Sequence, residues 1–156
     1  MKKILFILPL LLLFTMCRST KTSTSAKEVS EVHYRDDFKA APATEKAAVL
    51  KELKATAEKY TVLVFTQNFK GEKVTVSNAT KKLYSDYVIS NLKTGIAGKT
   101  RIDNTVDTKV YDNLTKKEIT LLAKDAANYK FVYLMKNIGG ETTFTITYSN
   151  TLRPLE

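Results

Sequence analysis

The chain has 156 residues and carries 25 Lys and Arg against 16 Asp and Glu, so its net charge is +9. This length predicts one domain with a core of its own. One cysteine and one histidine exclude an internal disulfide framework and a multi-histidine metal site. The positive charge permits contact with anionic partners such as lipid headgroups, lipopolysaccharide or cell-wall polymers. Because it is spread along the chain and not gathered into a basic run, we interpret it first as a solvated surface.

Residues 1–16 have the parts of a secretory signal peptide. Lys2 and Lys3 precede an apolar run from Ile4 to Phe14, which Pro9 interrupts. This run is shorter than the roughly 20 apolar residues that a spanning helix needs. We therefore expect a segment that is removed, after which the net charge would be +7 because two lysines leave with it.

Two lysines, a short apolar core and a cysteine at its end resemble the signal peptide of bacterial lipoproteins, over residues 1–17 only. In that family the cysteine becomes the lipid-bearing first residue, so the resemblance implies that Cys17 is lipidated. A diacylglycerol and an N-acyl chain bury many methylenes at about 0.8 kcal/mol each, which makes such anchoring stable. The rest of the chain matches no characterised family by its motifs.

The residue after the cysteine indicates which membrane a lipoprotein of this family is anchored in. Lipoproteins retained at the inner membrane commonly have Asp there, whereas this chain has Arg18. The resemblance therefore implies the cell envelope, on the periplasmic side of the outer membrane. The alternative is an unmodified Cys17 with cleavage by ordinary signal peptidase, for instance after Ala26.

A Ser, Thr and Lys-rich stretch follows, and we interpret residues 17–41 as a lipid-anchored tether and connector that includes His33. Pro42 then precedes Thr44, which is placed to cap a helix from Glu45. Apolar positions recur at helical spacing: Leu50, Leu53, Ala57 and Tyr60. Residues 42–60 are thus predicted to form an amphipathic helix that packs on the following domain.

From residue 61 to 156 the apolar period changes to two, with turn residues between short runs. The expected strands lie within residues 61–67, 72–78, 80–86, 86–91, 98–104, 107–113, 117–123, 128–137 and 142–150. Such spacing predicts a mainly β fold: an antiparallel β-sandwich of immunoglobulin-like size, preceded by one amphipathic α-helix.

In two of these runs the pattern predicts which faces of the strand are buried. Phe144, Ile146 and Tyr148 alternate with Thr and Ser, which predicts a strand with one buried face. Residues 129–135 are apolar on both faces, so that strand should be central, with the helix as one cover. We interpret its alternating rings as core rather than as a stacking platform: Tyr129, Phe131 and Tyr133.

The motif GIAGKT, residues 95–100, ends like a phosphate-binding loop. However, the first glycine of that motif is replaced by Lys93, and a strand-like run rather than a helix follows. We interpret Gly95 and Gly98 as turn residues.

Acidic residues also offer no metal motif. Asp103, Asp107 and Asp112 surround a predicted turn but lack the Gly and the terminal Glu of a calcium loop, so we assign them to the surface.

The remaining chemistry is sparse. His33 lies outside the predicted sheet and Cys17 is assigned to lipid, so neither supplies a catalytic triad. We therefore predict a non-catalytic, lipid-anchored cell-envelope protein without metal or cofactor, which binds a partner protein of an envelope assembly or an anionic polymer, and no nucleic acid. The alternative is a secreted soluble inhibitor or small-ligand carrier; a carboxylate-dependent hydrolase comes third.

Overall fold

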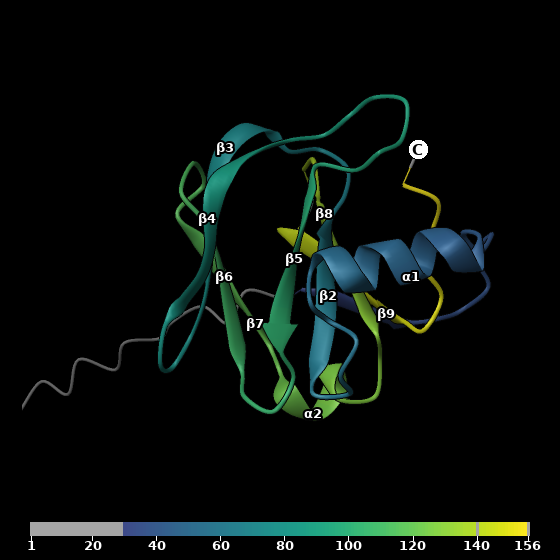
Figure 1. The fold of residues 1–156 in the computed structure, drawn as a ribbon. Helices are drawn as coiled ribbons and strands as arrows, with labels where there is room; N and C mark the ends of the chain where they lie inside the picture. Colours follow the sequence, from purple (N-terminus) through teal and green to yellow (C-terminus); the bar gives the residue numbers. More distant parts are fainter. Residues whose placement is uncertain (1–29, 140, 156) are drawn as a thin grey trace, which may run out of the picture.

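The structure is a computed structural model that describes residues 30–139 and 141–155, in which two β-sheets face each other (Figure 1). The elements in chain order are β1 (Glu31–Tyr34), α1 (Ala43–Glu52), β2 (Tyr60–Phe65), β3 (Lys70–Asn78), β4 (Lys82–Ile89), β5 (Gly98–Asp103), β6 (Thr108–Asp112), β7 (Lys117–Leu121), α2 (Ala123–Ala126), β8 (Phe131–Lys136) and β9 (Phe144–Ser149). The expectation of a mainly β, two-sheet sandwich is confirmed.

Sheet A has the strand order β1-β9-β8-β2-β5, and sheet B has the order β4-β3-β6-β7. All pairs in sheet B are antiparallel. In sheet A, β1 runs parallel to β9 and β2 runs parallel to β8, so the sandwich is not antiparallel throughout as expected. The reason is topological: after β2 the chain crosses to sheet B for β3 and β4, returns to sheet A as β5, and crosses again for β6 and β7 before it re-enters sheet A as β8 beside β2.

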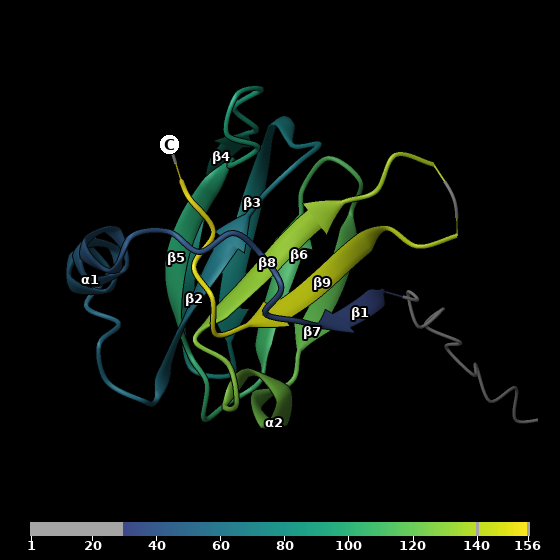
Figure 2. The ribbon, with the colours of Figure 1, turned by 90° about the vertical axis from the view of Figure 1, so that its right-hand side faces the viewer.

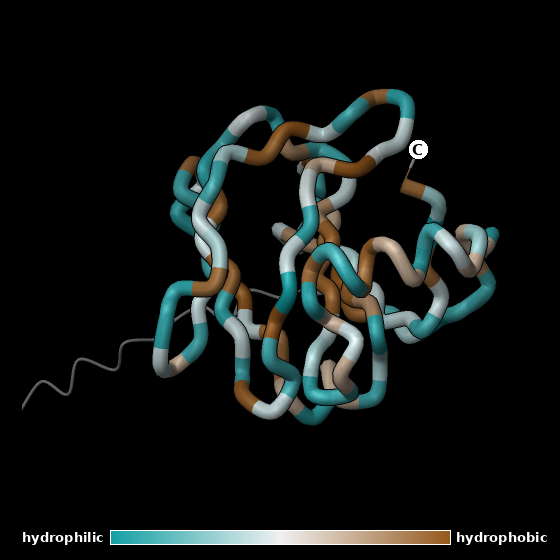
Figure 3. Tube along the Cα trace, in the orientation of Figure 1, coloured by the Kyte–Doolittle hydropathy of each residue, from teal (hydrophilic) through white to brown (hydrophobic). Residues whose placement is uncertain are grey.

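The main core lies between the two sheets. Alternate residues of β2 to β9 enter it, and the apolar and polar segments that alternate along the strands are visible in Figure 3. Phe144, Ile146 and Tyr148 of β9 all lie in this core, which confirms the predicted register of the last strand. Ile146 pairs with Leu134 of β8 and Val32 of β1.

A second apolar layer covers the outer face of sheet A. Figure 2 shows α1 beside that face and the segment after β9 crossing in front of it. Val49 of α1 and Leu152 pack there against Phe131 and Tyr133 of β8. The prediction that β8 is central and covered on both sides is therefore confirmed, and the helix supplies one cover. Tyr129 instead packs against the core between the sheets, so the three rings do not share one face.

The helix differs from its prediction. It begins at Ala43 with Pro42 as N-cap, so Thr44 is inside the helix, and it ends at Glu52 instead of continuing to Tyr60. The Ala55 N–H donates to the Leu50 carbonyl and the Lys54 N–H donates to the Lys51 carbonyl. This is a Schellman motif, which ends the helix by turning its backbone away.

The segment expected to be a connector is ordered by contacts with the end of the chain. Residues 31–34 form β1, which lies at the edge of sheet A, before the helix in sequence. Asp36 Oδ1 accepts hydrogen bonds from the Ser149 hydroxyl and from the backbone N–H groups of Asn150 and Thr151. The polar residues 33–37 therefore fix the two ends of the described chain to each other.

Two further strand predictions need correction. The runs 80–86 and 86–91 form one strand, β4, with a register irregularity between Val76 and Ser77 of its partner β3. The threonine face of β9 is buried as well, because Thr145, Thr147 and Ser149 are at most 8% exposed. Across residues 30–139 and 141–155, no helix combines the length and apolar character that crossing a bilayer requires.

A cationic cleft as the candidate functional site

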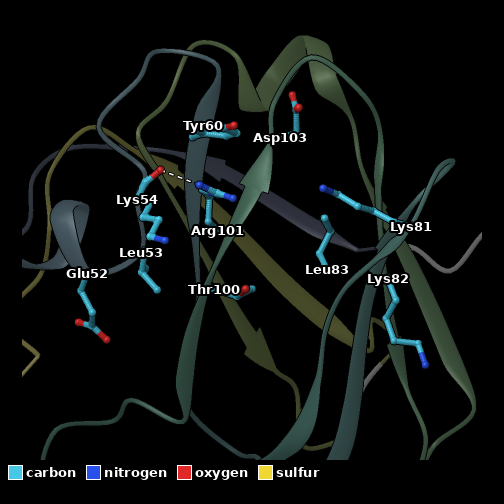
Figure 4. Close-up of a pocket in the computed structure, with 10 residues that line it drawn as sticks. All are labelled: Glu52, Leu53, Lys54, Tyr60, Lys81, Lys82, Leu83, Thr100, Arg101 and Asp103. Carbon is cyan, nitrogen blue, oxygen red and sulfur yellow. Dashed lines mark hydrogen bonds between the residues drawn. The ribbon is translucent and has the colours of Figure 1, made fainter.

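A cleft of about 380 Å³ opens between the turn after α1, strand β5 and the beginning of β4 (Figure 4). It lies where β5 of sheet A and β4 of sheet B, both edge strands, run side by side. The lining residues are Glu52, Leu53, Lys54, Tyr60, Lys81, Lys82, Leu83, Thr100, Arg101 and Asp103. Four of these side chains are cationic and two are anionic, so the cleft is positively charged.

Arg101 is the fixed cation of the cleft. Its guanidinium lies over the Tyr60 ring, with Cζ 4.2 Å from the ring centroid, and Nη1 donates to the Lys54 carbonyl at 2.8 Å. Tyr60 and Arg101 come from the paired strands β2 and β5, so the sheet sets their separation. Stacking and one hydrogen bond hold the guanidinium plane, which reduces the entropy lost when it binds an anion.

Lys54 connects the helix end to the cleft. Its φ of +51° places it in the left-handed region, at the position of the Schellman motif where glycine is favoured. This conformation costs a non-glycine residue on the order of 1 kcal/mol. It directs the Lys54 carbonyl to Arg101 while the lysine side chain lines the cleft (Figure 4).

Lys81 and Lys82 reach the cleft from the opposite sheet. The turn between β3 and β4 is closed by Asn78, whose Oδ1 accepts from the backbone N–H groups of Thr80 and Lys81, each at 3.0 Å. This Asx turn fixes the backbone that carries both lysines. Both residues are exposed, so their ammonium groups remain hydrated and mobile.

Two carboxylates border the cleft. Asp103 Oδ1 accepts from the Thr105 hydroxyl and backbone N–H, and these hydrogen bonds, with the charges of Lys59 and Lys81, keep its pKa below the ordinary value. Glu52 forms an exposed ion pair with Lys99 at 3.4 Å. Each carboxylate therefore has partners of its own, and Arg101 and Lys82 have no carboxylate ion-paired to them within the described part of the chain.

This arrangement suits the binding of an anion. A fixed guanidinium can donate to a phosphate or carboxylate group, and mobile lysines can follow neighbouring charges of the same ligand. The searched residues, 30–139 and 141–155, contain no group of three or more His, Cys, Asp and Glu side chains that could hold a metal ion.

The motifs from the sequence lie elsewhere or have structural roles. Gly95 has a φ of +70° in a turn, as predicted, whereas Gly98 is the first residue of β5 and not a turn residue. The GKT triplet forms the first three residues of strand β5, whereas a phosphate-binding loop would open a helix there.

The three aspartates do not converge. Asp103 binds Thr105, while Asp107 accepts from the Ala123 N–H. Asp112 is 1% exposed and ion-pairs with Lys136, so its assignment to the surface was wrong. His33 lies in β1 beside Glu31, with Nε2 3.0 Å from Oε1, so it is part of sheet A and not of a connector.

The cleft itself was missed because its cations come from three separate segments, at residues 54, 81–82 and 101. No local pattern joins them, and only the crossing of β4 and β5 brings them together. Cys17 lies outside the described residues. In comparisons with known proteins, neither a protein-family model nor a curated protein matches the chain.

Proposed function

We propose that this chain is a lipid-anchored cell-envelope protein whose folded body binds an anionic polymer through the cationic cleft, without catalysis. The observation that carries the binding proposal is that Lys54, Lys81 and Lys82 line one cleft together with the stacked guanidinium of Arg101. These cations belong to both sheets, so a ligand that engages all of them must bridge the edge of the sandwich.

A polymer suits this site better than a small anion. The two lysines on β4 and its turn are exposed, and single exposed charge contacts contribute little free energy each. Repeated charges on one chain add such contacts without a new association step. Negatively charged polymers of the envelope, such as polyphosphate-like chains or the anionic sugars of a cell surface, have this chemistry.

The location is proposed from the lipoprotein-like signal. A lipid on Cys17 would hold the body at a membrane, on the periplasmic side of an outer membrane because Arg18 follows the cysteine. Residues 18–30 would form the tether. Cys17→Ser should abolish metabolic labelling with fatty acid and leave the precursor unprocessed; normal processing of this variant would reject the anchor.

The binding is tested with the full-length protein in detergent and a fluorescent polyphosphate. We expect the double variant Lys81→Gln/Lys82→Gln to bind about tenfold more weakly, since each exposed charge near a polyanion is worth about 1 kcal/mol at most. The matched control is Lys73→Gln/Lys109→Gln, which removes the same charge from strands β3 and β6. We expect the control to change affinity less than twofold.

Salt gives a second readout. The affinity of the unchanged protein should fall steeply as salt rises, and the slope should be shallower in the Lys81/Lys82 variant because fewer counterions are released. Equal losses in both double variants would show that total charge, and not the cleft, determines binding. Saturable binding of an uncharged envelope polymer with no polyphosphate binding would reject the proposed function.

A further inference from the structure

A second pocket lies on the outer face of sheet A, away from the cationic cleft. Its volume is about 250 Å³, and its walls come from β1, from β8 and β9, and from the two segments that cross this face before α1 and after β9. Figure 2 shows both crossing segments in front of sheet A. The pocket is smaller than the roughly 300–1,000 Å³ of sites for drug-sized ligands, so only a small molecule fits.

Arg153 forms one wall and is held by aromatic rings. Its guanidinium Cζ lies 3.7 Å from the centroid of the Phe38 ring and 4.3 Å from that of Tyr133. Its backbone N–H also donates to the Tyr133 hydroxyl at 2.9 Å. These contacts fix the guanidinium before any ligand arrives.

Within residues 30–139 and 141–155, this guanidinium is not neutralised by an ion pair. Its Nε is buried without a hydrogen-bond partner, and no carboxylate of the described residues forms an ion pair with Arg153. The charge of Asp37 acts on Arg153, but Asp37 itself accepts hydrogen bonds from both Nε and Nη2 of Arg35 at 2.6 and 2.7 Å. Burial also lowers the pKa of Arg153 from its usual value, because the charge lacks full hydration.

The floor of the pocket is set by strand register. His33 of β1, Thr147 of β9 and Tyr133 of β8 are directly paired across three adjacent strands, so their side chains form one row on the outer face. The Thr147 hydroxyl makes no hydrogen bond within the described residues although Thr147 is only 7% exposed. It can donate to a ligand atom that also contacts Arg153.

The charges of the pocket limit the ligand to one negative charge. Arg35 is paired with Asp37, and His33 Nε2 contacts Glu31, which leaves Arg153 as the one arginine of the pocket that has no ion pair among the described residues. Glu31 lines the same pocket and would repel a second negative charge. A planar carboxylate matches the fork of a guanidinium, whereas a phosphate brings more charge than the pocket neutralises.

We propose that this pocket is a binding site for a small monocarboxylate, whose carboxylate accepts hydrogen bonds from Arg153 and from the Thr147 hydroxyl. The remainder of the ligand lies against Met135, which lines the pocket next to Thr145. This site is independent of the cationic cleft, because the two pockets share no residue.

The test is calorimetric titration of the full-length protein in detergent with acetate, benzoate, benzamide and inorganic phosphate. We expect saturable binding of acetate or benzoate, and none of benzamide, which has the shape of benzoate without its charge. Arg153→Gln should weaken carboxylate binding at least about tenfold, and Thr147→Val about tenfold, because the lost hydroxyl donates to a charged carboxylate. Lys109→Gln, on sheet B, should leave it unchanged.

Three outcomes overturn the proposal. One is that neither carboxylate binds saturably, and another is that phosphate binds more tightly than both. The third is carboxylate binding that Thr147→Val leaves unchanged, and this near-isosteric variant decides the matter if Arg153→Gln fails to fold. Polyphosphate binding through the cleft would remain as it is in each case, so this failure is distinguishable from failure of the proposed function.

Discussion

Nζ of Lys136 lies 2.7 Å from Oδ2 of Asp112 and joins the two sheets through a buried ion pair. Lys136 is the last residue of β8 in sheet A, and Asp112 is the last residue of β6 in sheet B. The same ammonium also contacts Oε1 of Glu72 in β3. The Lys136 side chain is 12% exposed and both carboxylates are 1% exposed, so one cation neutralises two buried anions.

Removal of the Lys136 charge should therefore strongly destabilise the folded protein. Lys136→Met is expected to lower the free energy of unfolding by about 3–5 kcal/mol, because it leaves two carboxylates buried without a counter-charge. The control is Lys109→Met, which breaks the exposed pair with Glu118 and should cost less than about 1 kcal/mol. Urea unfolding followed by circular dichroism measures both; equal costs would show that the buried pair has no special weight.

The pair also predicts how stability depends on pH. Burial acts to raise the pKa of Asp112, but the hydrogen bonds from Lys136 and from the backbone of Leu114 and Thr115 outweigh it, so this pKa lies below its ordinary value. A carboxyl with a lower pKa in the folded chain stabilises fully above its unfolded pKa, about 4, and loses that contribution as pH falls through the folded pKa.

Thermal melts from pH 6 to pH 2 should show this loss. The melting temperature of the unchanged protein should fall more steeply below about pH 4 than that of Asp112→Asn, which has no proton to bind there. Asp112→Asn should also be less stable at pH 6, where the ion pair is complete. Parallel curves for the two proteins would mean that other carboxyls cause the acid sensitivity.

Substitution of Lys54 should affect stability and the proposed binding in opposite directions. Lys54→Gly should raise the free energy of unfolding by about 1 kcal/mol, because glycine adopts the observed φ of +51° without strain. It should also weaken polyphosphate binding, since the side chain that lines the cleft is lost. Lys51→Gly, inside α1, is the matched control and should cost up to about 1 kcal/mol instead. A stabilised variant with unchanged binding would remove Lys54 from the site.

The last strand gives a test of the core. Ile146→Ala should cost about 2–5 kcal/mol because Ile146 is 3% exposed between the sheets, whereas Ile138→Ala, at a position 72% exposed, should cost less than about 0.5 kcal/mol. Thr145→Ala should lie between them, since its hydroxyl is bonded to Asn137 Oδ1 at 3.0 Å. Denaturant unfolding of the three variants gives the order, and a larger loss for Thr145→Ala than for Ile146→Ala would contradict the assigned faces.

Much of the strand pattern was predictable because a period of two is a local property of the sequence. The alternation through Phe144, Ile146 and Tyr148 located β9 and its core face correctly. The same pattern did not reveal that the threonine face is covered too, because the side chains of Glu31 and Asp36, which bond to Thr145 and Ser149, come from the other end of the described chain. A hydroxyl side chain can form hydrogen bonds with polar groups of the protein on a covered face as readily as it does with water, so the sequence pattern is the same in both cases.

The errors share a physical cause. The end of α1 was missed because Lys54 occupies the left-handed position where the usual signal is Gly. Strand β1 was missed because its residues are mostly exposed and its partner is the last strand of the chain. The buried Asp112 looked like a surface residue because the lysine that neutralises it is on the other sheet. The candidate site was missed for the same reason, because its cations are far apart in sequence and line one cleft only where β4 and β5 lie side by side.

The pairing of β1 with β9 has a consequence for how the chain is made. Glu31 and Thr145, which face each other in this pair, are 114 positions apart in sequence. Closing so long a loop is slow, and it must wait until the final strand has been synthesised. A chain truncated before residue 144 would leave β8 and β1 without the neighbour that lies between them. Sheet A is thus complete only once β9 has been made, and until then its exposed edges invite aggregation and proteolysis.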